Sequence, residues 1–139
     1  MDKFDPKNIS EDEKSALKNK ILSKSGDIDN KGHILWALKP NKTTGYPELK
    51  LPSILANRFG IFSAKNPGHM LFIMEKNLIL NCVNHDMSHL CHNKLCINPQ
   101  HLNYEPRWVN HARKTCVRNN VCGGHHVEQH DLHFPNCIL

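Results

Sequence analysis

The hydrophobic positions separate the chain into an N-terminal part with helical periodicity and a longer part with short apolar runs. Ser10 and Glu13 have the spacing of a capping box, and apolar residues then recur at helical intervals as far as Leu22. This pattern predicts an amphipathic helix over residues 10–24. We interpret residues 1–31 as a helical arm that packs against the rest of the protein and carries no chemistry.

Short apolar runs follow this arm, and such runs bounded by turn-forming residues are typical of strands. The predicted strands cover residues 33–36, 46–51, 70–74 and 77–80, with a turn over 40–45 and a short helix over 52–60. Beyond residue 82 the periodicity disappears, and residues that bind metals become frequent. We therefore expect a single mixed α+β domain over residues 32–139.

The composition indicates that apolar burial alone does not hold this domain together. Of the 139 residues 39% are hydrophobic, and the mean hydropathy is -0.54, so we expect a modest core. The chain carries six cysteines and eleven histidines. Its charged N-terminus lacks the apolar segment of a signal peptide, and no apolar run reaches the length of a membrane span. These features predict an intracellular protein, with the nucleus as one candidate location, and favour bound zinc over disulfides.

Two groups of cysteines and histidines have the spacing of zinc sites. Cys91, Cys96 and His101 lie five residues apart on a loop that contains Asn98 and Pro99. Structural zinc takes thiolate and imidazole ligands in a tetrahedron, so this group needs one further ligand from elsewhere in the chain. The second group consists of Cys116, Cys122, His125, His126, His130, His133 and Cys137.

The segment SHLCHNKLCINPQHL, which begins at Ser88, resembles the signature of the His-Cys box homing endonucleases. This family is a branch of the ββα-metal, or His-Me finger, nucleases. Its pattern continues with an asparagine nine residues after the last histidine ligand and a cysteine six residues later, and this chain has Asn110 and Cys116 at those positions. The resemblance is close over residues 88–122 and extends weakly upstream to Gly32.

The resemblance implies an α+β His-Me finger fold with small antiparallel sheets, few helices and long loops stapled by two structural zinc sites. It also implies a DNA endonuclease that hydrolyses phosphodiester bonds with one magnesium ion. In the family, the histidine before the first knuckle cysteine is the general base, which corresponds to His89. The asparagine of the following helix holds the ion, which corresponds to Asn110. A neutral imidazole suits proton abstraction near pH 7, and a single amide ligand leaves room for the waters that magnesium retains.

The resemblance leaves the complete zinc ligand sets open. Family members have a cysteine at the start of an upstream hairpin, where this chain has His33, and imidazole can replace thiolate on zinc. We favour His33 as the fourth ligand of the first site, with Cys82 as the alternative. For the second site the family pattern implies Cys116, Cys122, His125 and Cys137, with His126 or His133 as the alternative histidine.

The formal net charge of +5 favours an anionic partner, and the resemblance implies double-stranded DNA. The family inserts a twisted antiparallel sheet into the major groove, which here corresponds to residues 31–51. Lys50 and Arg58 are the candidates for holding the scissile phosphate. Further candidates for phosphate contacts are Lys31, Lys39 and Lys42 on the predicted sheet and Arg107, Arg113, Lys114 and Arg118 around the predicted active helix.

Two alternatives to an endonuclease stay open. The first is a non-catalytic zinc-dependent DNA-binding domain of the same fold, which is similar to the Smad DNA-binding domains, and the second is a structural zinc module that binds protein. The presence of both His89 and Asn110 favours the enzyme. Family members dimerise partly through a C-terminal tail beyond the second zinc site, whereas this sequence ends two residues after Cys137. We therefore expect a monomer, or a homodimer formed through another surface.

Overall fold

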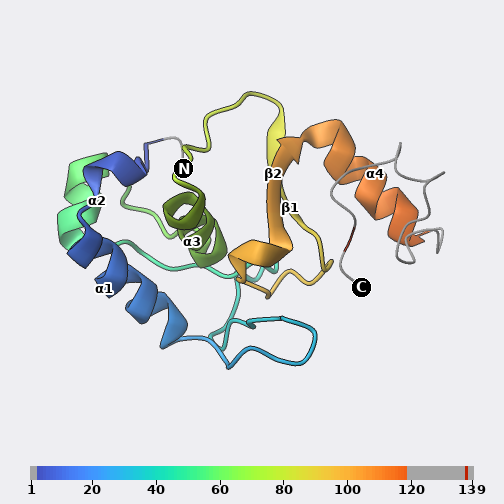
Figure 1. Ribbon diagram of the computed structural model, residues 1–139, viewed down its shortest axis with the longest axis horizontal. Helices are drawn as coiled ribbons and strands as arrows, with labels where there is room; N and C mark the ends of the chain where they lie inside the picture. Colours follow the sequence, from blue (N-terminus) through green and yellow to red (C-terminus); the bar gives the residue numbers. More distant parts are fainter. Residues whose placement is uncertain (1–2, 119–136, 138–139) are drawn as a thin grey trace.

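The structure is a computed structural model that describes residues 3–118 and Cys137, with side chains described as far as residue 114 and at Cys137. Figure 1 shows three helices grouped on one side and a small sheet with a fourth helix on the other. Among the described residues, no helix has the length and apolar character needed to cross a membrane. The elements in chain order are η1 (Pro6–Asn8), α1 (Glu11–Leu22), α2 (Ser53–Phe59), α3 (Pro67–Lys76), β1 (His85–His89), η2 (Pro99–His101), β2 (Leu102–Pro106) and α4 (Arg107–Arg118).

The start of α1 confirms the predicted capping box. Ser10 Oγ accepts a hydrogen bond from Glu13 N at 3.1 Å, and Ser10 N donates to Glu13 Oε1 at 3.0 Å. These two bonds satisfy backbone groups that the first turn of a helix leaves unpaired. The helix ends at Leu22 rather than at residue 24. The short helix predicted over 52–60 is also confirmed, as α2.

Residues 70–74 are helical, so the strand predicted there is wrong. They belong to α3, where Asn66 Oδ1 accepts hydrogen bonds from Gly68 N at 2.8 Å and from His69 N at 3.4 Å, and Pro67 opens the first turn. A capping asparagine followed by proline is a favourable helix start. Most of the helix surface is buried, so its apolar residues follow one another without a gap. Periodicity cannot distinguish such a helix from a buried strand.

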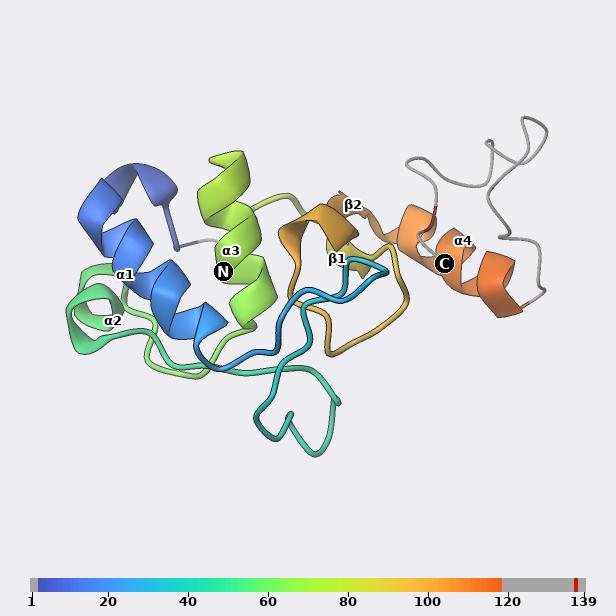
Figure 2. The same ribbon diagram turned by 60° about the horizontal axis from the view of Figure 1, so that its bottom comes forward.

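The antiparallel sheet predicted over residues 31–51 is not formed, and residues 77–80 form no strand either, although all of these residues are described. Figure 2 shows that the long connection between α1 and α2 instead runs beside the segment that contains β1 and η2. Its two halves pair with different segments, and no bridge within this fully described connection joins one half to the other as a hairpin. The isolated bridges that replace the hairpin join Leu35 to Cys96 and Leu49 to Lys65.

The sheet of the described chain consists of β1 and β2, which the hydrophobic pattern did not predict. The strands are antiparallel, with His85 opposite Pro106 and His89 opposite Leu102. Both strands are short and rich in polar residues, so neither has the clear alternation that marks a half-buried strand. Residues 90–101, here called the Cys-His loop, connect β1 to β2, and β2 leads directly into α4. This is the ββα order that the resemblance implies.

The apolar core lies mainly between α1, α2 and α3. Phe4 packs on Phe59 there, with 5.4 Å between the ring centroids. Burial of one such side chain contributes about 1.5–3 kcal/mol to stability. Ile97 of the Cys-His loop also reaches this core, and its N–H donates to Ile34 O at 2.8 Å. The fully buried apolar residues of the core are Phe4, Leu17, Ile21, Met70, Ile73 and Ile97.

Candidate metal centre and adjoining pocket

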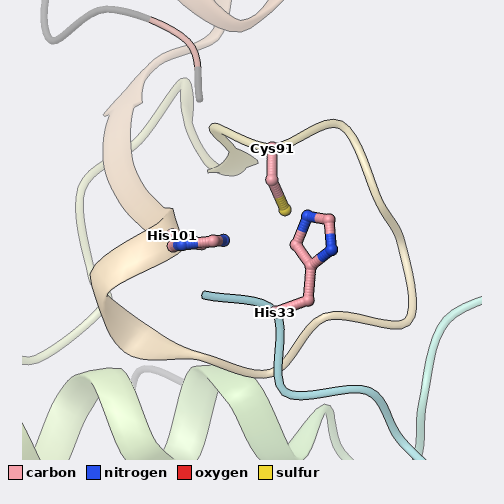
Figure 3. A group of neighbouring side chains, drawn as sticks. All are labelled: His33, Cys91 and His101. Atoms are coloured by element: carbon pink, nitrogen blue, oxygen red, sulfur yellow. The ribbon is translucent and has the colours of Figure 1, made fainter. Parts of the chain in front are cut away.

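Three of the predicted metal ligands converge where the long connection, β1 and η2 meet. One ligand atom from each of His33, Cys91 and His101 lies within 4.8 Å of the others. Figure 3 shows the Cys91 sulfur and a ring nitrogen of His33 turned toward each other, with the His101 ring alongside. Cys91 follows β1 and His101 ends η2, whereas His33 comes from the connection between α1 and α2.

Cys96, the remaining predicted ligand, lies beside this group but is not one of the three residues whose ligand atoms lie within 4.8 Å of one another. Its Sγ atom lies 3.7 Å from His101 Nδ1. A hydrogen bond between the two thiols raises the pKa of Cys91 and lowers the pKa of Cys96, so one of them ionises far more readily than the other. Two thiolates and two imidazoles are a donor set that tetrahedral zinc takes in structural sites. The residues present therefore fit a structural zinc ion.

The backbone of the Cys-His loop explains why its ligands face inward. Leu90 N donates to His101 O at 2.7 Å, which closes the loop at its base. Asn98 caps η2, and its Nδ2 donates to Gly32 O at 2.7 Å. Gly32 has a φ of +83°, and a Cβ atom there would lie 2.8 Å from His101 Nε2. Glycine is therefore required beside His33, because any side chain would displace the His101 ring.

Asp29 orients His33, and the sequence analysis missed this role. Its Oδ2 atom lies 3.2 Å from His33 Nδ1, while its Oδ1 atom accepts a hydrogen bond from His33 N at 2.8 Å. Burial raises the pKa of Asp29, but backbone hydrogen bonds from His33 and Lys31 outweigh it, so the net shift is downward. A carboxylate on one imidazole nitrogen leaves the other nitrogen free for a metal. The available signal was an aspartate four residues before the histidine.

The alternative fourth ligand, Cys82, is exposed and lies outside this group. Its backbone N–H donates to the Tyr104 hydroxyl at 3.0 Å. The structure thus brings His33, and not Cys82, to the first predicted zinc site.

The second predicted zinc site falls largely outside the described residues. Of its ligands, Cys137 is described and buried, and its Sγ atom lies 3.1 Å from His92 Nε2 and 3.7 Å from Arg113 Nη1. Cys116 belongs to α4, but its side chain is outside the described part. The remaining candidates, Cys122, His125, His126, His130 and His133, also lie outside it.

A pocket of about 200 Å³ adjoins the metal centre and contains both predicted catalytic residues. His89 ends β1, and Asn110 lies in α4. The Tyr46 ring stacks on His89, with 5.7 Å between the centroids and 27° between the planes. The lining residues are Tyr46, Met87, His89, His92, Lys94, Asn110 and Lys114.

The environment of His89 favours its neutral form. Burial lowers the pKa of His89 to about 4, and the nearby His92 and Lys94 add to this shift, while a hydrogen bond to the Cys96 backbone opposes it. The ring is therefore uncharged near pH 7 and can accept a proton. The same hydrogen bond connects the His89 ring to the backbone of Cys96, a predicted metal ligand.

A buried ion pair fixes α4 against the sheet. Arg113 donates to both carboxylate oxygens of Glu105, through Nε at 2.6 Å and through Nη2 at 2.8 Å. Ser88 and Asn103 also donate to this carboxylate. Burial raises the pKa of Glu105, but the hydrogen bonds from Arg113, Ser88 and Asn103 together lower it. The network joins both strands to the helix that carries Asn110.

Several basic residues predicted to contact DNA have other partners. Arg113 is 1% exposed in the pair just described, so it is not available to a phosphate. Arg107 pairs with Asp86. Arg58, a candidate for the scissile phosphate, donates to Glu13 and to Asn8 O at the helical side of the molecule. Lys50, the other candidate, is exposed and does not line the pocket of His89.

Comparison with known proteins agrees with this geometry. No curated protein and no solved structure gives a significant match to the chain. One family model matches residues 36–139, which include three of the four predicted ligands of the first zinc site and the whole adjoining pocket. The chain therefore belongs to the family described as the zinc-binding loop region of homing endonuclease.

Proposed function

We propose that this protein is an endonuclease that hydrolyses phosphodiester bonds in double-stranded DNA, with His89 as general base and one magnesium ion held by Asn110. The observation that carries the proposal is that His89 and Asn110 line a single pocket next to three converging residues that could hold a metal ion. Membership in a homing-endonuclease family supports the same reading.

His89 has the properties of a general base for a water molecule. It is neutral near pH 7 because burial lowers its pKa to about 4. Tyr46 stacks on one face of the ring, and the hydrogen bond to the Cys96 backbone fixes the ring orientation. A positioned base of this kind accelerates hydrolysis by roughly 100- to 10,000-fold.

Asn110 suits a hard divalent ion that keeps most of its own waters. Its amide oxygen is one protein ligand, and the pocket of about 200 Å³ leaves space for waters and for phosphate oxygens. A bound magnesium ion supplies positive charge to the phosphate and to the leaving oxygen. The pair of Arg113 and Glu105 holds α4, which carries Asn110, against β2, and Ser88 of β1 donates to the same carboxylate.

The first structural zinc ion is assigned to His33, Cys91, Cys96 and His101. Its role is to hold the loop between β1 and β2, and thereby the His89 ring. A second zinc ion at Cys116, Cys122, His125 and Cys137 stays a prediction. The same holds for the arm of residues 1–31, the domain of residues 32–139, the oligomeric state and the intracellular location.

Plasmid cleavage tests the proposal. Protein with measured zinc content is incubated with supercoiled plasmid, with and without added magnesium at one salt concentration, because phosphate contacts make DNA affinity salt-dependent. Magnesium is omitted rather than chelated, so that zinc is retained. We expect cleavage with magnesium only, and a loss of about 100- to 10,000-fold in rate for His89→Ala.

The matched control is His85→Ala, which removes a histidine from the other end of β1 and outside the pocket. It should keep the cleavage rate. If zinc-loaded protein binds DNA and leaves it intact at every pH tested and with every divalent ion tested, the endonuclease proposal is wrong. A non-catalytic DNA-binding domain would then be the function.

A further inference from the structure

Phosphodiester hydrolysis needs positive charge near the phosphate, and preorganised charge in a partly enclosed site is especially effective. In the described part of the chain, the lysines that line the pocket of His89 are Lys94 and Lys114. Neither of the candidates suggested by the sequence, Lys50 and Arg58, lines it. We therefore expect the cation that contacts the phosphate to be one of the residues that line the pocket.

Lys94 sits in the segment between the metal ligands Cys91 and Cys96. Asn93 stabilises this segment, since its Oδ1 accepts a hydrogen bond from Leu95 N at 3.0 Å and its backbone oxygen accepts one from Cys96 N at 3.1 Å. Two metal ligands and these bonds fix the backbone on both sides of Lys94. Its position is thus preorganised by the metal centre.

The side chain of Lys94 is directed to the Tyr46 side of the pocket. Its Nζ atom donates to Thr44 O at 3.2 Å and lies 5.1 Å from the centroid of the Tyr46 ring. That ring stacks on His89. The three groups form a continuous wall of Lys94, Tyr46 and His89 along one side of the pocket.

The charge of Lys94 is available to an anion. An ammonium group has three N–H donors, and Thr44 O takes one of them. None of the described carboxylates forms an ion pair with Lys94, and the side chain is exposed. The other pocket lysine, Lys114, lies four residues after Asn110 and therefore on the same helix face as Asn110. The two lysines thus reach the pocket from different elements, Lys94 from the Cys-His loop and Lys114 from α4.

We infer that Lys94 binds a non-bridging oxygen of the phosphate under attack and holds that phosphate against His89. This inference rests on the proposed endonuclease function, and it identifies Lys94 as the residue that positions the DNA phosphate. The end of β1 then contributes the base and the Cys-His loop that follows it contributes the phosphate-binding cation, which leaves the Asn110 side to the divalent ion.

Lys94→Met tests the inference, because methionine keeps much of the apolar stem over Tyr46 and removes the charge. Single-turnover cleavage of plasmid is measured at saturating protein, beside DNA affinity at several salt concentrations. We expect the rate constant to fall about 100-fold or more, as for the loss of one preorganised donor. Lys94→Arg should recover a large part of the rate, since it restores the positive charge.

Lys76→Ala is the charge control, because it removes one positive charge from an exposed position on α3 outside the pocket. It should cleave at the wild-type rate. Zinc content and circular dichroism of all variants establish that the fold is retained. A Lys94→Met variant that is folded and cleaves as fast as Lys76→Ala would overturn the inference.

The binding measurement separates this inference from the proposed function. Loss of one phosphate contact should reduce the slope of log affinity against log salt by about 1. If the wild-type protein binds DNA without cutting it, the endonuclease proposal fails, while the slope still decides whether Lys94 contacts a phosphate. An unchanged slope for Lys94→Met would contradict the contact in either case.

Discussion

Around α1, α2 and α3 the buried side chains are apolar, whereas around β1, β2 and α4 they include charged groups and predicted metal ligands. In the described part of the chain, the buried polar and charged side chains all lie between Ser88 and Arg113. The side formed by α1, α2 and α3, here called the helical side, thus derives its stability from hydrophobic burial. This contribution falls roughly in proportion to the apolar area that a mutation exposes. The side that contains the candidate metal centre and the pocket of His89 depends on a few polar contacts, so loss of a single partner leaves a buried polar group without compensation.

This contrast explains where the predicted chemistry lies. The side held by polar contacts contains the pocket of His89 and Asn110. A small domain with a modest core can position such groups only if metal ligands and ion pairs replace the missing apolar burial. The following predictions test this division between the two sides.

Zinc removal should cause the largest loss of stability. It should unfold the part of the molecule around β1 and β2 before the helical side. Structural zinc contributes on the order of 10 kcal/mol or more of apparent folding free energy in small metal-binding peptides. Elemental analysis should find at least one zinc per chain. Hydrogen exchange during titration with a chelator should show loss of protection in residues 85–106 before loss in α1. Simultaneous loss in both parts would contradict the division, and folded protein without zinc would contradict the metal centre.

Arg113→Ala should cause the next largest loss of stability. It leaves Glu105 charged and buried, and breaking a buried pair in this way costs about 3–5 kcal/mol. Arg58→Ala is the matched control, because Arg58 pairs with Glu13 on the helical side at 35% and 30% side-chain exposure. Solvent screens that pair, so the control should lose far less. Urea unfolding of the zinc-loaded variants measures both, and equal losses would show that burial does not distinguish the two pairs.

Acid should weaken the pair of Glu105 and Arg113 by a smaller amount, because a protonated carboxyl keeps part of its hydrogen bonding. The folded protein holds the pKa of Glu105 below its usual value of 4.5. The stability from this shift is therefore present above pH 4.5 and is lost as pH falls through the lower pKa of the folded state. Unfolding of wild type and Glu105→Gln should be compared from pH 7 downward. The stability difference between them should shrink below pH 4.5, and a constant difference would refute the assignment.

Asp29→Asn should have the smallest effect, on zinc affinity alone. Asparagine can still accept the hydrogen bond from His33 N, but it removes the charge that faces His33 Nδ1. Loss of such a partner typically weakens metal binding by about 10- to 100-fold. Competition with a chelating dye measures the change. Asp27→Asn removes a nearby exposed charge and should leave the affinity unaltered; a similar loss in both variants would show a general charge effect.

The sequence determined those features that depend on neighbouring residues. Ser10 and Glu13 define the start of α1 because a capping box needs only the first turn. The spacing of Cys91, Cys96 and His101 indicated a metal-binding loop, and the motif around it indicated the family that the comparison confirms. The predicted strands failed because apolar runs do not reveal which distant segment a backbone will pair with, and the polar strands β1 and β2 show no such runs.

Only the tertiary structure decided which partners meet across long stretches of chain. It placed His33 rather than Cys82 beside other predicted metal ligands, and it buried Arg113, which the sequence had suggested for DNA. It also brought Lys94 to Thr44, fifty residues away, and so to the pocket. Local sequence specifies how a residue can bond. The identity of its hydrogen-bond or ion-pair partner depends on chain packing. Packing determines which polar groups are buried away from water, and buried polar groups need a partner within the protein.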